Sequence, residues 1–371
     1  MYFRIPLFLI VFLGLGCTSN SQIPKMKSYS IDLPEIGYFD GKLFKEGGFS
    51  GLTLDKSDPT ILYAINDRGP NSYVDGQIVV PFPDYSQKIF KLKWIKDEGI
   101  YFLEFFPLKF NDTTLTNGFS PPLDNEFLNE TLVGGAEKVF LEKSEAGMDF
   151  EGITIDQNGF FWACEEYRPA ILKINPTSLI IENIISPYSN TELKILKNRE
   201  PNRGFEAITA TPDGHIIAVM QSPLEIEDEK DGGLTRIMKY HPVSGKVTWY
   251  FYPMEKPTGN LRASDWKIGD ISAINDHEFL IVEHAHRKNT TFKYLTKITI
   301  KDELLRKEFF LNLMELGWDS SLEKVEGIQI LDPHHIAIVN DNDYSVQSRE
   351  SIPTKIFIIE LPESMKLKRI P

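Results

Sequence analysis

A two-strand motif recurs five times along the chain, and this repetition constrains the fold more than any other feature of the sequence. In each copy, a run of apolar and β-branched residues leads through a turn rich in Asp, Asn, Gly or Pro to a second apolar run, which is the pattern of a β-hairpin. The copies occupy residues 50–67, 151–166, 206–221, 270–283 and 326–341. The chain is therefore expected to be built from repeated antiparallel units.

The spacing of the copies predicts the architecture. Most copies lie about 55 to 65 residues apart and the first gap is about twice as long, whereas a four-stranded propeller blade uses roughly 40 to 60 residues. Two more strand-like runs follow each hairpin, as at residues 235–240 and 246–252. We therefore predict an all-β protein, a β-propeller of six four-stranded blades, with one masked blade between about Ile78 and Leu141.

Segments outside the hairpins extend this prediction. Residues 88–94 and 100–106 are expected to be the outer strands of the first blade. Residues 28–33 are expected to form an N-terminal strand beside residues 355–361 in the last blade, which removes a free sheet edge. Residues 302–316 carry leucines near helical spacing, so an amphipathic helix is an alternative there.

The N-terminus has the pattern of a targeting segment. Arg4 precedes an apolar run at residues 5–15, which is too short to span a bilayer and is typical of a signal peptide. Gly16 and Cys17 follow at once and resemble the end of a bacterial lipoprotein signal, so we predict lipidation of Cys17 and a lipid-anchored protein in the bacterial cell envelope, periplasmic or surface-exposed. Plain secretion and an uncleaved anchor are the alternatives. The predicted boundaries are 1–16 for the signal peptide, 17–27 for a tether and 28–371 for one propeller domain.

The net charge of the chain restricts the kinds of molecule that it is expected to bind. Lys and Arg number 40 against 53 Asp and Glu, which gives a net charge of −13. Nucleic acid and anionic membrane surfaces are poor partners for such a chain, so membrane contact is expected through the lipid anchor only. A small anionic substrate would need a local basic pocket or a bound cation. Because Cys17 is predicted to be lipidated, Cys164 is left without a disulfide partner, and we expect a monomer stabilised by its core.

Acidic residues occupy equivalent places in the repeats. The first strands open with Ser50, Glu151, Glu206, Asp270 and Glu326, and the second strands close with Asp67, Glu165, Gln221, Glu283 and Asp341. Since the innermost strands of a propeller line its central channel, these side chains are expected to gather around the axis at one end. Such a set of oxygen ligands suits Ca²⁺. The predicted ligands are Asp67, Glu151, Glu206, Asp270, Glu283, Glu326 and Asp341. The alternative is that these acids cap backbone N–H groups at strand ends.

Arginine residues lie beside these acids in the sequence. Guanidinium groups bind phosphate and carboxylate in a bidentate manner, so Arg68 and Arg203 are predicted to stabilise an anionic substrate during catalysis, with Glu165 as general base. Salt bridges to the neighbouring acids are the structural alternative. His284 and His286 share one face of a strand and could add nitrogen ligands, although exposed strand-end histidines are commoner.

Several catalytic motifs are absent from the sequence. It contains no GxSxG elbow, no HExxH, no Walker phosphate loop, no CxxC and no GxGxxG. The absence of these motifs disfavours a serine hydrolase of that type, a zinc protease, an NTPase and a dinucleotide-binding enzyme.

Six short motifs occur in a characteristic order. They are GFSGL at 48–52, NDRGP at 66–70, FEGI at 150–153, NRGFE at 202–206, QSPL at 221–224 and KVEGI at 324–328. In this order they resemble the phytase-like propeller family, described as having esterase-like activity of phytase, over about residues 40–361. The resemblance implies a secreted or periplasmic propeller and a hydrolase of phosphate or other esters, distantly similar to the calcium-dependent propeller phytases.

Two classes of function follow. The first is a Ca²⁺-dependent hydrolase in which the cation holds an anionic ester, Arg68 and Arg203 stabilise the developing charge, and a carboxylate acts as base. The second is a noncatalytic surface propeller that binds a ligand or a partner. A lactonase-like propeller with a single axial metal is a further alternative.

Overall fold

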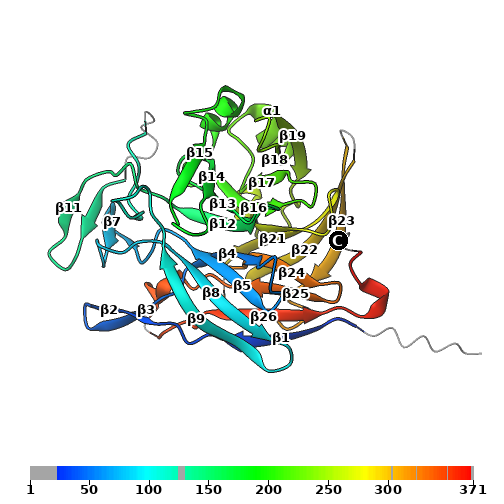
Figure 1. The fold of residues 1–371 in the computed structure, drawn as a ribbon, viewed down its shortest axis with the longest axis horizontal. Helices are drawn as coiled ribbons and strands as arrows, with labels where there is room; N and C mark the ends of the chain where they lie inside the picture. The colour runs from blue at the N-terminus through cyan, green and yellow to red at the C-terminus, as the bar shows by residue number, and fades with distance from the viewer. Residues whose placement is uncertain (1–22, 124–129, 302–303, 323, 349, 369–371) are drawn as a thin grey trace, which may run out of the picture.

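The computed structural model describes residues 23–123, 130–301, 304–322, 324–348 and 350–368. Five sheets of four antiparallel strands are arranged around a common axis (Figure 1). Their innermost strands are β4 (Phe49–Leu54), β12 (Phe150–Ile155), β16 (Phe205–Ala210), β20 (Trp266–Ala273) and β24 (Glu326–Asp332). Each inner strand packs against the next, and β24 packs against β4, so the ring is closed. The described part of the chain is therefore a β-propeller.

The outer strands follow the inner strand in order away from the axis. The first blade adds β5 (Ile61–Asn66), β8 (Lys88–Ile95) and β9 (Gly99–Pro107), and the second adds β13 (Phe161–Glu165), β14 (Ala170–Ile174) and β15 (Ile181–Ile185). The third adds β17 (Ile216–Met220), β18 (Leu234–Tyr240) and β19 (Val247–Pro253), and the fourth adds β21 (Glu278–Arg287), β22 (Thr290–Lys301) and β23 (Leu304–Asn312). The predicted outer strands of the first blade are thus confirmed.

The last blade is closed by the N-terminal strand. Its strands β25 (His335–Val339) and β26 (Lys355–Glu360) are followed by β1 (Lys25–Ser30), which pairs antiparallel with β26. This confirms the predicted closure, although β1 begins and ends three residues earlier than expected. The pairing covers the edge that β26 would otherwise expose.

Apolar cores between neighbouring blades hold the ring together. A separate cluster of buried side chains fills each of the five interfaces, including the one between the last blade and the first. All six residues of β16 are buried, because both faces of an inner strand meet a neighbouring blade. This explains why the hairpin motif is continuously apolar rather than alternating. Each large side chain buried in this way contributes about 1.5 to 3 kcal/mol.

The prediction of six blades is wrong for the described residues. The long first gap holds an insertion instead of a blade: β6 (Ser72–Val74), β7 (Gln77–Val80), β10 (Leu132–Gly134) and β11 (Val139–Leu141) form a small sheet at the side of the ring (Figure 1). Its strands β7 and β10 pair parallel, unlike any pair within a blade. A further hairpin, β2 (Glu35–Phe39) and β3 (Lys42–Lys45), lies outside the blades.

The helical alternative for residues 302–316 is also wrong. Strand β23 pairs antiparallel with β22 over most of this segment. Leu304 and Phe309 are 77% and 65% exposed, so the apolar residues at helical spacing do not form one buried face. The α-helix within the described ranges is the short α1 (Glu227–Gly232), and the longest 3-10 segment is Thr191–Asn198.

The predicted signal peptide and the lipidation site Cys17 lie outside the described residues. Within the residues that are described, no helix combines the length and the apolar character that a membrane crossing requires.

Candidate functional site

A β-bulge in each inner strand sets the geometry of the site. The regular pairing of inner and second strands is interrupted at or beside Ser50, Glu151, Glu206, Asp270 and Glu326. A bulge inserts an unpaired residue and turns its side chain out of the regular alternation. The strands approach closely here, since a Cβ on Gly51 would lie 2.7 Å from the Cα of Gly152. Small residues at this motif position therefore allow the inner strands to meet at the axis.

Eight carboxyl groups gather at this end of the channel, and we call this set the acidic cup. Its members are Asp67, Asp149, Glu151, Glu166, Glu206, Glu326, Asp341 and Asp343, each of which either shifts the pKa of another member or has its own pKa shifted by one. They come from the starts of inner strands and from the loops after second strands. The structure thus brings five of the predicted ligands together: Asp67, Glu151, Glu206, Glu326 and Asp341.

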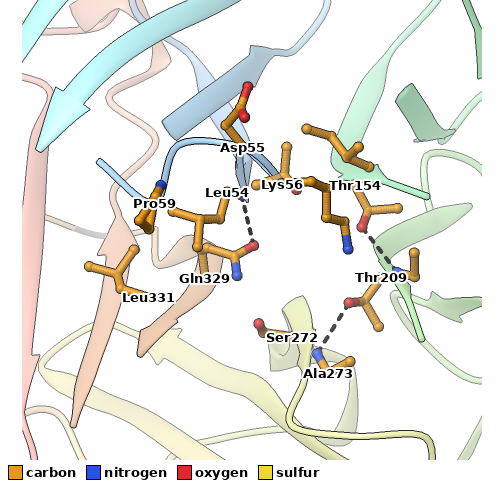
Figure 2. Close-up of a pocket in the computed structure, with 13 residues that line it drawn as sticks. Leu54, Asp55, Lys56, Pro59, Thr154, Thr209, Ser272, Ala273, Gln329 and Leu331 are labelled. Atoms are coloured by element: carbon orange, nitrogen blue, oxygen red, sulfur yellow. Dashed lines mark hydrogen bonds between the residues drawn. The ribbon is translucent and has the colours of Figure 1, made fainter. Parts of the chain in front are cut away.

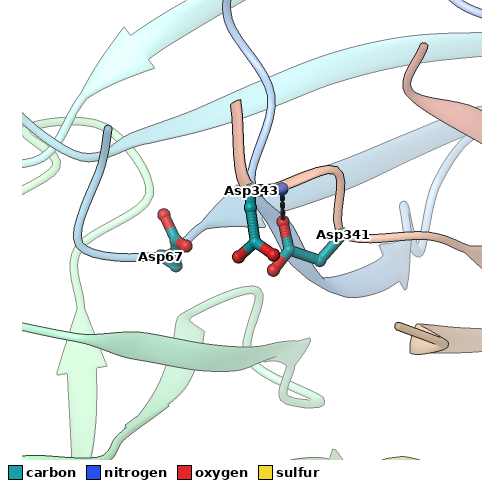
Figure 3. Close-up of side chains that lie close together, drawn as sticks. All are labelled: Asp67, Asp341 and Asp343. Atoms are coloured by element: carbon teal, nitrogen blue, oxygen red, sulfur yellow. Dashed lines mark hydrogen bonds between the residues drawn. The ribbon is translucent and has the colours of Figure 1, made fainter. Parts of the chain in front are cut away.

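Two tight clusters lie within the acidic cup. The first consists of Asp67, Asp341 and Asp343, with ligand oxygens within 4.8 Å of one another. Figure 3 shows Asp341 and Asp343 side by side with Asp67 facing them, and the backbone N–H of Asp343 donates to Asp341 Oδ1 at 2.7 Å. The second cluster consists of Asp149, Glu151 and Glu166, with the same upper limit on their separation.

The acidic cup cannot carry a full negative charge on every member. Burial and the neighbouring carboxylates raise the pKa values of Glu151 and Glu206 well above their usual range. Burial also raises the pKa of Glu326 to about 8 and that of Asp341 to about 6, with nearby acids adding to both shifts. Groups of this kind keep protons near neutral pH unless a cation compensates their charge.

Basic side chains border the acidic cup. Lys324 Nζ donates to Asp341 Oδ2 at 2.6 Å and to Asp343 Oδ1 at 2.7 Å. Arg203 donates to the side-chain oxygen of Gln221, and the positive charges of Arg203 and Lys267 act on Glu166. These groups could bind the anionic part of a substrate at the edge of the acidic cup.

His284 also faces the acidic cup. Its ring is 6% exposed, and burial together with Lys293, Lys267 and Lys324 lowers its pKa well below the usual range. The imidazole is therefore neutral, and its Nε2 has no hydrogen-bond partner within the described ranges. A neutral nitrogen of this kind can accept a hydrogen bond or bind a metal.

Glu283, a predicted ligand, lies on the opposite face of β21 from His284, because successive side chains of a strand alternate between faces. Glu283 accepts hydrogen bonds from Tyr252 Oη at 2.6 Å, from the backbone of Glu255 at 2.6 Å and from Lys307 Nζ at 2.8 Å. These three donors occupy the Glu283 carboxylate, so the structure does not support its assignment as a ligand.

Glu165, the predicted general base, is held by Arg168, although its charge acts on Asp149 and its Oε1 has no hydrogen-bond partner among the described residues. It accepts from the backbone N–H of Arg168 at 2.7 Å and lies 3.6 Å from the Arg168 guanidinium. Burial, opposed by Arg168, raises its pKa to about 7. Glu166, the next residue, is the member of the acidic cup.

Asp270 is used as a cap between blades. Its Oδ2 accepts from the backbone N–H of Ile328 at 2.7 Å, which joins β20 to β24. The side chain is 1% exposed. For this residue the structure supports the capping alternative rather than the metal ligand.

Arg68 is held by a partner that the hairpin motif does not contain. Its guanidinium binds Glu130 in a bidentate manner at 2.9 and 3.1 Å and lies over the ring of Tyr167. Its backbone N–H donates to Asp149 Oδ1 at 3.0 Å. Arg68 therefore positions one member of the acidic cup through its main chain.

Sequence reasoning missed Asp149, Glu166, Asp343, Lys324, Lys267 and Glu130. Glu166 directly follows the predicted Glu165, and Asp149 stands two residues before the predicted Glu151, so both lie close in the sequence to positions that were chosen. Lys324 opens the family motif at 324–328, and Asp343 lies two residues after the predicted ligand Asp341. Glu130 comes from the insertion, and no repeat position points to it.

The opposite end of the channel is lined by hydroxyl and amide groups of the inner strands, with Asp55 and Lys56 also at its border. A cavity of about 330 Å³ lies there, bordered by Thr154, Thr209, Ser272 and Gln329 (Figure 2). Thr154 and Thr209 accept from the backbone N–H groups of Ala210 and Ala273 at 3.0 and 3.1 Å. Ser272 and Gln329 accept from the next strand in the same way. These side chains join neighbouring blades.

Solved structures share only a distant likeness with the chain. A protein from Lactobacillus plantarum is 10% identical, with a TM-score of 0.39 over 86% of this chain and 89% of that one. A PQQ-bound aldose sugar dehydrogenase from Streptomyces coelicolor is 10% identical, with a TM-score of 0.37 over 91% and 98%. A gluconolactonase from Xanthomonas campestris is 10% identical, with a TM-score of 0.33 over 91% and 98%. No curated protein matches the chain.

The family comparison is more informative. The family model described as "Esterase-like activity of phytase", called Phytase-like, matches residues 45–344. This range runs from the loop before β4 to the last carboxylates of the acidic cup, so it includes all five inner strands. The chain belongs to the phytase-like family.

Proposed function

We propose that the protein is a metal-dependent hydrolase of phosphate or other esters, with Ca²⁺ as the expected cation. One observation carries the proposal: carboxyl groups from all around the channel converge on one place, and two buried oxygens among them, Glu166 Oε1 and Glu206 Oε2, have no hydrogen-bond partner in the described chain. Unpaired buried carboxylate oxygens are costly, and a bound cation compensates them. Oxygen donors of this kind suit Ca²⁺.

The basic groups at the edge give this site its proposed chemistry. A bound cation would polarise the ester and offset the repulsion between the substrate and a chain with a net charge of −13. Arg203 is the better placed of the two predicted arginines, because Arg68 would bind substrate only after releasing Glu130. Glu326 lies in the acidic cup itself, and burial raises its pKa to about 8, so it is better placed as a base than Glu165.

The proposed setting is the bacterial cell envelope. Lipid on Cys17 would hold the propeller at a membrane as a monomer, and the substrate would be a small anionic molecule outside the cytoplasm. Replacement of Cys17 by Ser should release the protein from membranes. Membrane retention by Cys17→Ser, without acyl mass on wild-type Cys17, would remove this part of the proposal.

The test of the catalytic proposal is metal analysis followed by a substrate panel. Aryl phosphate, phytate, aryl ester and lactone substrates are incubated with the metal-free protein, with added Ca²⁺ and with chelator. We expect Ca²⁺-dependent turnover of at least one substrate. Turnover that survives chelation would contradict the proposed site.

A second candidate function is ligand binding without catalysis. The bidentate ion pair between Arg68 and Glu130 favours it, because the predicted anion clamp is already occupied. In this case Ca²⁺ would raise the melting temperature, as any ligand of the folded state does, while every substrate in the panel stays intact.

A further inference from the structure

The two clusters of the acidic cup have matching geometry but different neighbours. In each, three carboxyl groups offer oxygens within 4.8 Å of one another. Two oxygens bound to the same Ca²⁺, at about 2.4 Å each, lie at most about 4.8 Å apart. Distance alone therefore allows a cation in both clusters, and the surrounding charges must decide between them.

The cluster of Asp67, Asp341 and Asp343 already contains a positive charge. The Lys324 ammonium lies 2.6 Å from Asp341 and 2.7 Å from Asp343, which are the distances of charge-assisted hydrogen bonds. The remaining Asp67 accepts from the backbone N–H of Gly69 at 2.8 Å. An ammonium and a divalent cation at the same carboxylates would repel each other strongly.

In the cluster of Asp149, Glu151 and Glu166, no described ammonium or guanidinium group lies at ion-pair distance, although Arg203, Lys267, Lys324 and Arg199 act on Glu166, and Arg68 on Asp149, from farther away. No ion pair within 4.0 Å involves these three acids among the described side chains, although Asp149 accepts from a backbone N–H. Glu166 is 2% exposed and its Oε1 has no hydrogen-bond partner in the described ranges. Glu206, which is 3% exposed, raises the pKa of Glu151 and has its own pKa raised by Glu166, and it likewise has an unpaired Oε2.

We propose that the acidic cup binds one divalent cation, at Asp149, Glu151 and Glu166, and that Lys324 takes the place of a second cation at Asp67, Asp341 and Asp343. This inference rests on the proposed metal dependence and specifies it. The Lys324 ammonium compensates the negative charge of the second cluster, and its repulsion keeps a divalent cation from binding there. Removal of its charge should open a second site.

The test is the number of calcium ions bound per chain, measured by calorimetric titration of the metal-free protein and by native mass spectrometry. We expect one ion in the wild type, two in Lys324→Met and one in Lys324→Arg, which keeps the positive charge. Glu166→Gln should lose the first site, and the double variant Lys324→Met with Glu166→Gln should bind one ion at the second cluster. Lys307→Met, which removes a lysine paired with Glu283 outside the acidic cup, serves as the matched control and should bind one ion.

The outcomes separate this inference from the proposed function. Two ions in the wild type, or one ion in Lys324→Met, would overturn the inference while leaving a metal site in place. No ion in the wild type would overturn the metal dependence itself and the inference with it. Circular dichroism shows whether each variant is folded, and Lys324→Gln, also expected to bind two ions, replaces Lys324→Met if the latter does not fold.

Discussion

The two ends of the central channel are built from the same five inner strands, but the side-chain oxygens at the two ends differ in their hydrogen bonding. At the hydroxyl-lined end, Thr154, Thr209 and Ser272 each accept a hydrogen bond from the backbone of the next blade. At the acidic cup, oxygens of Glu166 and Glu206 have no such partner within the described chain. A side chain at a repeated position therefore joins neighbouring blades where its oxygens accept backbone hydrogen bonds. It is available to bind a ligand where an oxygen has no hydrogen-bond partner.

Asp270 illustrates the distinction within the acidic end. It occupies a repeat position equivalent to that of Glu206, yet its Oδ2 accepts a backbone hydrogen bond across the blade interface, while its Oδ1 has no partner in the described chain. Acidic character alone therefore does not identify a ligand. An unpaired oxygen must also lie within a cluster of carboxyl groups, and the following predictions test this contrast.

The largest effect is expected from Glu206→Gln. Loss of this carboxylate, whose charge acts on the proposed ligand Glu151, should markedly reduce the rise in melting temperature caused by Ca²⁺ and lower turnover roughly 10²- to 10³-fold, or about 2.7 to 4 kcal/mol, the scale of one lost transition-state charge contact. Melting curves with and without Ca²⁺ and steady-state rates measure this. The matched control is Thr209→Val on the same strand β16, at the other end of the channel. If both variants keep the Ca²⁺ response, the two ends do not differ as described.

A pH dependence should follow from the protonated acids of the acidic cup. Folding raises the pKa of Asp341 from 3.8 to about 6 and that of Glu326 from 4.5 to about 8. The metal-free folded state then binds more protons than the unfolded state between about pH 4 and 8, so its stability should fall as the pH rises through this window. Saturating Ca²⁺ should flatten the decline, because the cation replaces the protons. Denaturant unfolding at several pH values checks this, and a rise of stability with pH in the metal-free protein would contradict it.

Glu283→Gln should separate stability from ligand binding. The substitution weakens charge-assisted hydrogen bonds from Lys307 and Tyr252 and should cost about 1.5 to 3 kcal/mol of unfolding free energy. Since Glu283 faces away from the acidic cup, the rise in melting temperature with Ca²⁺ should persist. Loss of that response in a folded variant would return Glu283 to the ligand set.

The smallest effect is expected at the hydroxyl-lined end. Thr209→Val leaves the half-buried backbone N–H of Ala273 without its acceptor and should destabilise the protein by about 1 kcal/mol. The affinity for Ca²⁺ should not change. Urea unfolding and a calcium titration of the same sample measure both quantities, and a weakened affinity would show that the two ends are coupled.

Much of the fold and part of the site could be predicted without coordinates. The hairpin repeats indicated the propeller, and the pairing of β1 with β26 was expected from the two terminal runs. Five members of the acidic cup, among them Glu151 and Glu206, were identified because equivalent positions of repeats meet at the axis. Local periodicity and repetition contain this information, since they depend on which residues can form a buried inner strand.

Tertiary structure alone decided the blade number and the facing of individual side chains. A first gap of double length fits either an extra blade or an insertion, and only the pairing of β7 with β10 shows that it is an insertion. The choice of Glu166 over Glu165, and of His284 over Glu283, depends on strand register. Because side chains alternate between faces and a bulge shifts that alternation by one residue, adjacent positions in the sequence point to opposite sides of a blade.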